Sequence, residues 1–363
     1  MSFFSSKNKP LSGETLEQII ALIEDFFELK KENLITAHVD NKHNVWIRFP
    51  FLVDSVWPQV QASLSEAGLP VKQIQKQYNI PIFNAKQMPV ANVKNIIAVS
   101  SGKGGVGKSA SALNLALALQ LEGARVGILD ADIYGPSIPI MLGTQGEHPQ
   151  SKDEKNMQPV MAHGLASNSI GYLVDNEHAS IWRGPMASKA LGQLLKETVW
   201  PTLDYLIVDM PPGTGDIQLT MCQQLPLTAA VVVTTPQDIA LSDAGKGIAM
   251  FEKLEIPVLG LIENMSYFEC GHCHKRTAIF SEKGAQKLSS KYNLPILAQV
   301  PLNPIIREFA DEGRSLLHEQ QAHPVSIIYR EAAINLSRNL CEIAQVLPLA
   351  ANMASSIEVT RLD

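Results

Sequence analysis

The sequence is short of cysteine, of positive charge and of long apolar runs, and each shortage excludes a class of protein. Four cysteines in 363 residues are too few for a disulfide scaffold, so we expect a cytoplasmic setting, where a Cys-x-x-Cys pair binds metal or does redox work. No apolar run reaches the length of a membrane span, and residues 1–10 lack an apolar signal core. The formal net charge of −6 argues against a protein that coats nucleic acid. We therefore expect neither a membrane nor a nucleic acid among the partners.

One glycine-rich stretch matches the phosphate-loop pattern Gly-x-x-x-x-Gly-Lys-Ser/Thr. An apolar run of buried-strand type precedes it, and apolar residues at helical spacing follow it, as this pattern requires. Such glycines let successive backbone N–H groups point at one anion, and the helix adds the positive end of its dipole. We expect Lys108 to be catalytic, by reaching the β- and γ-phosphates of ATP, and Ser109 to bind Mg²⁺. A flexible Gly/Lys loop is the alternative interpretation. The residues expected to bind the nucleotide are Gly102, Lys103, Gly104, Gly105, Val106, Gly107, Lys108 and Ser109.

Hydrophobic periodicity divides the chain into two folded parts. Residues 1–83 show helix, strand, strand and helix patterns without cysteine or a glycine-rich loop, so we expect a small α+β domain with a docking or structural role. Residues 84–94 are the expected linker. Residues 95–348 alternate apolar strand-like runs with helical patterns, which predicts an α/β P-loop domain with a mostly parallel sheet. The expected strands are residues 95–100, 125–130, 205–209, 229–234, 258–264 and 296–300. Residues 349–363 lose this periodicity and form the expected tail.

Polar side chains end several of the expected strands, where ligands of open α/β sheets collect. Asp130 and Asp132 end one apolar run, and Asp209 closes another. We expect Asp130 and Asp209 to hold Mg²⁺, directly or through water, and Asp132 to be catalytic, since phosphoryl transfer depends mainly on positioning. Capping the next element is the alternative role of each acid. Asn264, at the end of a later strand, has an amide that can read the edge of adenine.

Cys270 and Cys273 form a Cys-x-x-Cys pair in the loop that follows Asn264. The loop has no second pair, so one chain offers two thiolates, with His272 or His274 as helpers, and this is an incomplete tetrahedral site. A two-fold dimer would supply four thiolates, enough for a [4Fe–4S] cluster or a Zn²⁺ ion. A redox dithiol is the third possibility. The spacing of the thiolates does not by itself separate iron from zinc.

From Val93 to about Val346 the chain resembles the Mrp/ApbC family of iron–sulfur cluster carriers, which are P-loop ATPases of the MinD/ParA class. The resemblance rests on residues 101–109, 130–139, 182–186, 209–216, 235–238 and 263–266 and on Cys270 and Cys273. It implies an ATP-hydrolysing homodimer that bridges a [4Fe–4S] cluster through these cysteines and passes it to apoproteins. In the MinD/ParA class, the first lysine of the loop contacts the phosphates bound by the partner chain. The resemblance therefore implies a catalytic role for Lys103.

A positioning ATPase of the MinD/ParA type is the alternative function. It explains the phosphate loop equally well and leaves Cys270 and Cys273 as a zinc or structural site. It also predicts a basic face or a basic amphipathic helix at the C-terminus. Residues 352–363 instead carry one Arg against two acids. The sequence therefore favours the cluster carrier.

Overall fold

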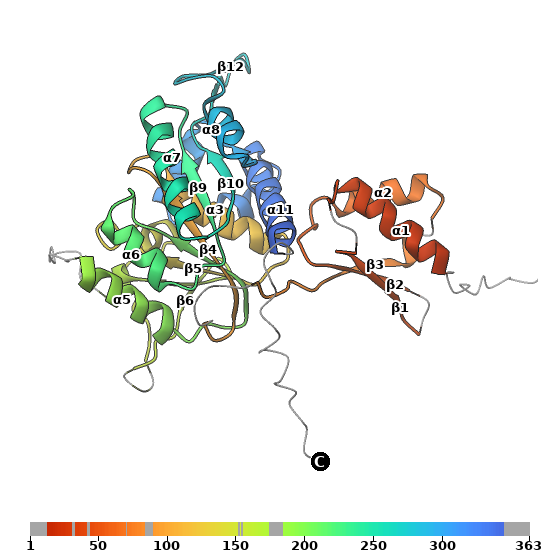
Figure 1. Ribbon diagram of the computed structural model, residues 1–363, viewed down its shortest axis with the longest axis horizontal. Coiled ribbons are helices and arrows are strands. Elements are labelled where there is room, and N and C mark those ends of the chain that lie inside the picture. Colours follow the sequence, from red (N-terminus) through yellow and green to blue (C-terminus); the bar gives the residue numbers. More distant parts are fainter. Residues whose placement is uncertain are drawn as a thin grey trace, which may run out of the picture.

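The computed structural model describes residues 13–30, 33–41, 44–69, 71–83, 90–151, 153, 155–173 and 184–344. It contains a small α+β domain and a larger α/β domain with a mostly parallel sheet (Figure 1), which confirms the predicted fold class. Residues 84–89 of the expected linker and the expected tail, residues 349–363, lie outside the described residues. The first strand of the large sheet begins at Val93, inside the expected linker. The exact domain boundaries stay a prediction.

The small domain packs two helices on one face of a three-stranded sheet (Figure 1). Strand β1 is antiparallel to β2, and β3 is parallel to β2. The elements are α1 (Gly13–Phe26), β1 (Thr36–Val39), β2 (Val45–Phe49), α2 (Trp57–Glu66), η1 (Val71–Gln73) and β3 (Ile74–Tyr78). The sequence pattern predicted both helices and the first two strands. It missed β3 because Ile74 is the only aliphatic residue of that strand.

The large domain is built on eight strands in the order β13-β10-β9-β4-β8-β5-β7-β6. Every neighbouring pair is parallel except β6 with β7. A separate antiparallel hairpin, β11 with β12, follows β10. The strands are β4 (Val93–Ser101), β5 (Val126–Asp130), β6 (Val160–Ala162), β7 (Leu165–Ser169), β8 (Leu203–Asp209), β9 (Ala229–Thr234), β10 (Val258–Glu263), β11 (Phe268–Glu269), β12 (Arg276–Thr277) and β13 (Ile296–Gln299).

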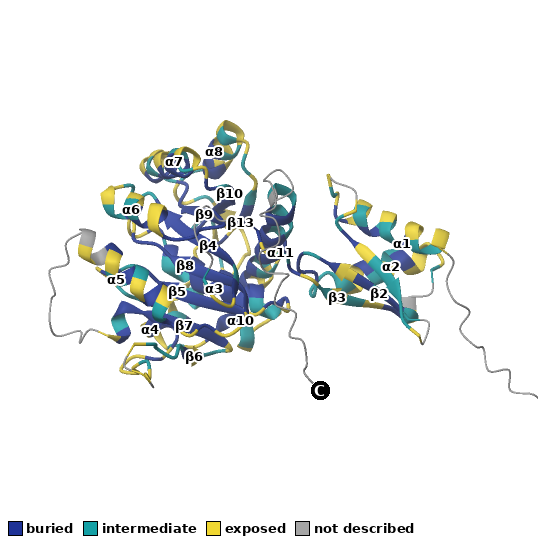
Figure 2. Cartoon of the chain, turned by 60° about the horizontal axis from the view of Figure 1, so that its bottom comes forward, coloured by how far each residue is buried: buried dark blue, intermediate teal, exposed yellow. Residues whose placement is uncertain are grey.

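Helices cover both faces of this sheet, and Figure 2 shows most of its strands as buried. Helices α3, α4, α9, α10 and α11 contribute to the core on one face, and α5 to α8 contribute to the core on the other. The helices are α3 (Lys108–Leu121), α4 (Ile138–Met141), η2 (Ile170–Tyr172), α5 (Gly184–Glu197), α6 (Asp216–Gln224), α7 (Asp238–Lys253), α8 (Gly284–Tyr292), α9 (Pro304–Asp311), α10 (Leu316–Glu319) and α11 (Pro324–Ala344). Within the described residues, no helix has the length and apolar character of a membrane span.

Successive residues of β4 belong alternately to the two cores. Ile97 and Val99 pack on the side of α3, whereas Ile96 and Ala98 pack on the side of α7. Side chains of a strand alternate between its faces, so a strand buried on both faces is apolar at every position. This is why β5, β8, β9, β10 and β13 were predicted from apolar runs. The run Leu-Ala-Ser-Asn-Ser of β7 lacks that signal, and β7 was missed.

The small domain docks onto α11 and the carboxyl end of α3 (Figures 1 and 2). Glu122, which follows α3, is fully buried. It accepts a hydrogen bond from the backbone N–H of Ser55 in the small domain at 2.8 Å and one from the Arg330 guanidinium at 2.6 Å. The guanidinium charge offsets the cost of burying the carboxylate. The phosphate-loop helix therefore touches the small domain at its far end.

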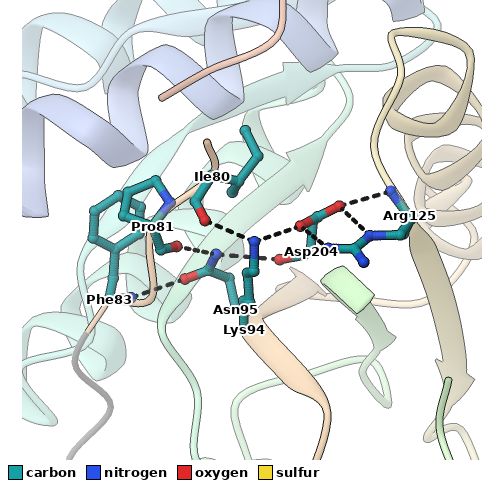
Figure 3. Close-up of polar contacts among 7 residues, drawn as sticks. All are labelled: Ile80, Pro81, Phe83, Lys94, Asn95, Arg125 and Asp204. Atoms are coloured by element: carbon teal, nitrogen blue, oxygen red, sulfur yellow. Dashed lines mark hydrogen bonds and ion pairs between the residues drawn. The ribbon is translucent and has the colours of Figure 1, made fainter. Parts of the chain in front are cut away.

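A polar cluster fixes residues 80–83, the chain leaving the small domain, to the large sheet (Figure 3). Asp204 accepts hydrogen bonds from Arg125 through Nε at 3.0 Å and Nη2 at 2.9 Å, and it pairs with Lys94 Nζ at 2.9 Å. Lys94 also donates to the carbonyl oxygen of Ile80 at 2.9 Å. Burial raises the pKa of Asp204, but the hydrogen bonds from Arg125 and Lys94 outweigh it and lower the pKa to about 2.

Candidate functional site

The phosphate loop connects the end of β4 to the start of α3, at the carboxyl edge of the parallel strands. Gly105 and Gly107 have φ angles of 78° and 79°, a region that favours glycine. A Cβ atom at Gly102 would collide with the backbone of Asp243 in α7, and one at Gly107 would collide with the amide of Asn264. Backbone conformation and lack of space therefore both require glycine here. Helix α3 starts directly after Gly107, so the positive end of its dipole faces the loop.

Lys108 and Asp209 form a buried ion pair beneath the loop. Nζ of Lys108 lies 2.5 Å from Oδ1 of Asp209, and the side chains are 6% and 0% exposed. Nζ also lies 3.2 Å from the hydroxyl oxygen of Ser109. Burial raises the pKa of Asp209, and the charge of Lys108 opposes this shift. The structure thus brings the loop lysine together with the acid at the end of β8, and the magnesium role of Asp209 stays a prediction.

The second oxygen of the Asp209 carboxylate suits a cation. Oδ2 is buried and accepts no hydrogen bond from the residues that the structure describes. A buried acceptor without a partner is costly, and native proteins explain most such atoms by a bound water or ion. The hydroxyl of Ser109 lies beside the same ion pair. Carboxylate and hydroxyl oxygens are ligands that Mg²⁺ accepts, so these two residues fit a magnesium site.

Asp130 lies opposite Asp209 in the register of β5 and β8, but its oxygens are engaged within the protein. Oδ2 accepts hydrogen bonds from the backbone N–H of Ser137 and the hydroxyl of Ser169, both at 3.1 Å. Oδ1 accepts from the backbone N–H of Asp132 at 3.1 Å. Burial and then repulsion by Asp209 raise the pKa of Asp130 to about 7. These contacts stabilise the loop after β5, and the magnesium role of Asp130 stays a prediction.

Asp132 lines a cleft of about 650 Å³ beside the phosphate loop. Tyr134 also lines the cleft, and the other lining residues come from the turn after β8 and from α6: Pro211, Pro212, Gly215, Asp216, Ile217, Gln218 and Thr220. The turn borders the loop, because the backbone N–H of Gly213 donates to the carbonyl of Ser101 at 2.9 Å. Burial raises the pKa of Asp132, and the charge of Lys108 opposes it. A carboxylate in this place can orient water, and the catalytic role of Asp132 stays a prediction.

Lys103 lies on the same loop but away from the buried ion pair. Its ammonium contacts the side-chain oxygen of Gln237 at 3.4 Å, and its carbonyl accepts a hydrogen bond from the Ser101 hydroxyl at 2.9 Å. The side chain is half-buried. The two loop lysines thus have different partners within one chain. Whether Lys103 acts on a partner chain stays a prediction.

Asn264 follows β10 and contacts the loop directly. Its Nδ2 donates to the carbonyl oxygen of Val106 at 2.9 Å, and its side chain is buried. A primary amide has two N–H donors, so this bond leaves one donor for another partner. The predicted contact of Asn264 with adenine stays a prediction, whereas its contact with the loop is a finding of the structure.

Cys270 and Cys273 lie in the turn of the β11–β12 hairpin, which projects beyond α8 (Figure 1). The backbone N–H of His274 donates to the carbonyl of Cys270 at 2.9 Å and closes the turn. Cys273 is exposed and Cys270 is half-buried. Hydrogen bonds from the backbone N–H groups of Cys273 and His272 lower the pKa of the Cys270 thiol. A lowered pKa favours the thiolate, which is the form that binds metal.

The two remaining cysteines are of a different kind. Cys222 and Cys341 are buried, and burial raises the pKa of both thiols, that of Cys222 to about 12. Among the described residues, no group of three or more His, Cys, Asp and Glu side chains is placed to hold a metal ion. Within the described part of one chain the hairpin therefore offers two thiolates, and a four-thiolate site would need two more.

The fold and the site define a P-loop nucleoside-triphosphate-binding protein. A family model described as a NUBPL iron-transfer P-loop NTPase matches residues 92–337. The chain is 52% identical over 360 residues to the iron–sulfur cluster carrier protein of Salmonella typhimurium, which covers 95% of this chain and 98% of that protein. It is 46% identical over 257 residues to the iron–sulfur cluster transfer protein NUBPL of Mus musculus, covering 70% and 80% of the two chains.

Two solved structures share the fold of the large domain. A nucleotide-binding protein from Archaeoglobus fulgidus in complex with ADP has a TM-score of 0.57 and 36% identity, covering 65% of this chain and 91% of that one. The cell-division ATPase MinD of Pyrococcus furiosus has a TM-score of 0.50 and 21% identity, covering 67% and 98%, and shows the shared fold alone. The chain belongs to the Mrp/ApbC/NUBPL family of P-loop NTPases of the ParA/MinD class and is an iron–sulfur cluster carrier. The resemblance seen in the sequence is confirmed.

Sequence reasoning missed two polar residues of the site. Gln218 of α6 donates to the hydroxyl of Ser100 just before the phosphate loop, and Glu263 at the end of β10 is buried beside Asn264. An acid that ends an apolar strand run had already pointed to Asp209, and the same signal could have identified Glu263. No comparable signal marks Gln218.

Proposed function

We propose that this carrier hydrolyses ATP with Mg²⁺, holds one [4Fe–4S] cluster between two copies of the chain, and passes it to apo iron–sulfur proteins in the cytoplasm. One observation carries the proposal: a complete phosphate loop and a projecting two-thiol hairpin occur on one chain, at connected ends of β4 and β10. The relatives from Salmonella typhimurium and Mus musculus are named for carrying or transferring clusters. A relative from Arabidopsis thaliana is named as mitochondrial. The cytoplasmic setting that we propose for this chain therefore rests on its cysteine usage alone.

The residues around the loop support hydrolysis by positioning. Lys108 is paired with Asp209 beneath the loop and would exchange this partner for the β- and γ-phosphates. Loop N–H groups and the start of α3 would bind the phosphate oxygens. Asp132, which lines the adjacent cleft, would orient the attacking water. Phosphoryl transfer of this kind requires no covalent intermediate on the protein.

Magnesium would be held by Ser109 and Asp209, the latter directly or through water. The unpartnered Oδ2 of Asp209 and the neighbouring hydroxyl supply the oxygen ligands that this ion prefers. When bound, Mg²⁺ neutralises charge that develops on the phosphate oxygens. Lys108 would then leave Asp209 for the nucleotide, so the charge of the acid remains compensated throughout.

The hairpin thiols support a cluster shared by two chains. Cys270 and Cys273 together provide two thiolates, and a [4Fe–4S] cluster takes four. A two-fold axis beside the hairpin would bring the second pair, and exposure of Cys273 allows the approach. Zinc would satisfy the same four thiolates, and a redox dithiol would need no partner. The family to which the chain belongs favours the cluster over both.

Dimer formation would also complete the nucleotide site. Lys103 is half-buried, and its ammonium contacts the neutral amide oxygen of Gln237 within the described residues, so its charge is available to a phosphate. By resemblance to the MinD/ParA class, that phosphate belongs to the nucleotide of the partner chain. One dimer would thus assemble both the four-thiolate site and the hydrolytic site.

A cluster-transfer assay tests this function. The chain is reconstituted anaerobically with iron and sulfide, freed of excess reagents, and mixed with an apo-enzyme whose activity requires a [4Fe–4S] cluster. We expect the recipient's activity to return, at a rate that Mg-ATP changes and a non-hydrolysable analogue does not reproduce. Phosphate release is measured in the same preparation.

Two cysteine variants make the assay specific. Cys270→Ala should restore nothing, because the shared site loses two of its four thiolates in the dimer. Cys222→Ala, which removes a buried thiol elsewhere, should match the wild type. Equal transfer by Cys270→Ala and the wild type, or transfer indifferent to ATP, would reject the proposal.

A further inference from the structure

Asn264 connects the phosphate loop to the strand that leads to the cysteine hairpin. Its Nδ2 donates to the carbonyl oxygen of Val106 at 2.9 Å, and its own backbone N–H donates to the carbonyl of Thr234 at 2.8 Å. The side chain is 8% exposed. It packs so closely that Gly107 has no room for a Cβ atom. The amide is therefore fixed between the loop and the edge of the sheet.

The Val106 carbonyl that accepts this hydrogen bond belongs to the part of the loop that binds phosphate. The carbonyl of Val106 and the N–H of Gly107 belong to one planar peptide unit and point in opposite directions. Loop N–H groups are the donors that cradle phosphate. Any rotation that turns the Gly107 N–H toward a phosphate therefore turns the Val106 carbonyl relative to Asn264.

A short segment held by backbone hydrogen bonds connects Asn264 to the cysteines. Ser266 donates its backbone N–H to the carbonyl of Val300 at 2.9 Å, and the carbonyl of Tyr267 accepts from Leu302 at 2.7 Å. Strand β11 begins at the next residue, and its last residue directly precedes Cys270. The path follows the edge of β13 and its extension throughout. A displacement at Asn264 thus reaches the hairpin within a few bonded residues.

Glu263 fixes the end of β10, so that a displacement of Asn264 is not taken up by movement of the neighbouring residues alone. Its carboxylate is 1% exposed. Oε2 accepts from the Ser266 hydroxyl at 2.6 Å and from Gln299 at 2.9 Å, while Oε1 accepts from the backbone N–H of Ala285 at 2.6 Å. The carboxylate therefore ties the end of β10 to β13 and to the start of α8. A buried acid with every oxygen hydrogen-bonded acts as a rigid clamp.

We propose that Asn264 is the positioning residue through which occupancy of the phosphate loop alters cluster binding at Cys270 and Cys273. The inference rests on the proposed function and names the route that couples its two sites. Coupling between sites is reciprocal: if nucleotide changes cluster affinity by some factor, the cluster changes nucleotide affinity by the same factor. The ratio of two nucleotide affinities therefore measures the coupling.

The experiment measures the dissociation constant of Mg-ADP by anaerobic calorimetry, for the cluster-free and the cluster-loaded full chain. For the wild type we expect the two constants to differ by about fivefold or more, the lower end of typical allosteric coupling. For Asn264→Ala we expect a ratio near one, even if both constants shift together. Asn264→Asp keeps the shape but replaces the donor by an acceptor, and it should also give a ratio near one.

Asn339→Ala is the matched control. Asn339 of α11 donates its side-chain N–H to the carbonyl of Leu259 at 3.1 Å, so the variant removes an equivalent bond from the same strand, β10, near its opposite end. It should keep the wild-type ratio. Thermal unfolding and iron content confirm that each variant is folded and loaded.

Each other result overturns the inference. A wild-type ratio in Asn264→Ala would mean that coupling runs through the dimer contact, and loss of coupling in Asn339→Ala as well would mean general loosening of β10. No detectable Mg-ADP binding by Asn264→Ala would assign the residue to the adenine base instead. A wild type that takes up its cluster but shows a ratio near one rejects the coupling alone. A wild type that takes up no cluster rejects the proposed function, and the inference with it.

Discussion

Replacing Lys108 by alanine should destabilise the protein as well as inactivate it. Its side chain is 6% exposed, and its Nζ lies 2.5 Å from Oδ1 of the fully buried Asp209. Removing one partner of a buried pair costs about 3–5 kcal/mol, because the other charge is left uncompensated. In a protein of 363 residues that loss lowers the melting temperature by about 4–7 °C. ATP hydrolysis should fall by about 100-fold or more, as when a fixed electrostatic contact to the reacting group is lost.

The double variant Lys108→Ala/Asp209→Asn separates the two effects. A neutral amide at position 209 leaves no buried charge, so urea unfolding should show most of the lost stability restored while hydrolysis stays as low as in the single variant. The single variant should also have a characteristic pH dependence. Burial raises the pKa of Asp209, and loss of Lys108 raises it further. In the variant, the pKa of Asp209 in the folded state exceeds its unfolded value of about 3.9. The loss of stability is therefore smallest below that pH and grows as the pH rises through the folded pKa. A Lys108→Ala protein as stable as the wild type at about pH 8 would refute the reasoning.

Three further variants test other parts of the site and fold. Lys103→Ala should bind Mg-ADP in calorimetry but lose most phosphate release, and an affinity loss equal to that of Lys108→Ala would show that Lys103 acts within its own chain. Asp132→Ala should lower hydrolysis by about 100-fold with little change in nucleotide affinity, and retained turnover would reject its positioning role. Asp204→Asn should cost about 2 kcal/mol in urea unfolding at neutral pH, against under about 0.5 kcal/mol for the exposed Asp311→Asn; equal costs would contradict the account of Figure 3. The contribution of Asp204 is present above its unfolded pKa and is lost as the pH falls through about 2.

The sequence predicted those features that depend on local pattern. Strands buried on both faces are continuous apolar runs, so β5, β8, β9, β10 and β13 could be located from hydrophobicity alone. The glycine pattern of the phosphate loop follows from backbone conformation and space, which is why a short motif predicts it. Acids that end apolar runs marked Asp130 and Asp209 as site candidates, whereas the pairing of β5 with β8 that sets them opposite each other is a finding of the structure.

Contacts between distant segments could not be predicted in this way. The bond from Asn264 to Val106 joins residues 158 positions apart, and no local pattern specifies its partner. The same holds for Glu122, whose burial against Ser55 and Arg330 depends on how the small domain docks. The hydrogen bonds that occupy Asp130 arise from the loop after β5, whose path the sequence pattern does not fix.

The stoichiometry of iron tests whether two copies of the chain share one cluster. We expect anaerobically reconstituted protein to appear in native mass spectrometry as a dimer with one [4Fe–4S] cluster, which is two irons per chain. Cys270→Ala and Cys273→Ala should lose both the brown chromophore and the cluster-bearing dimer, while Cys222→Ala and Cys341→Ala, which alter buried thiols, should keep them. A monomer that retains a full cluster, or a dimer that takes up only zinc when iron and sulfide are supplied, would contradict the account.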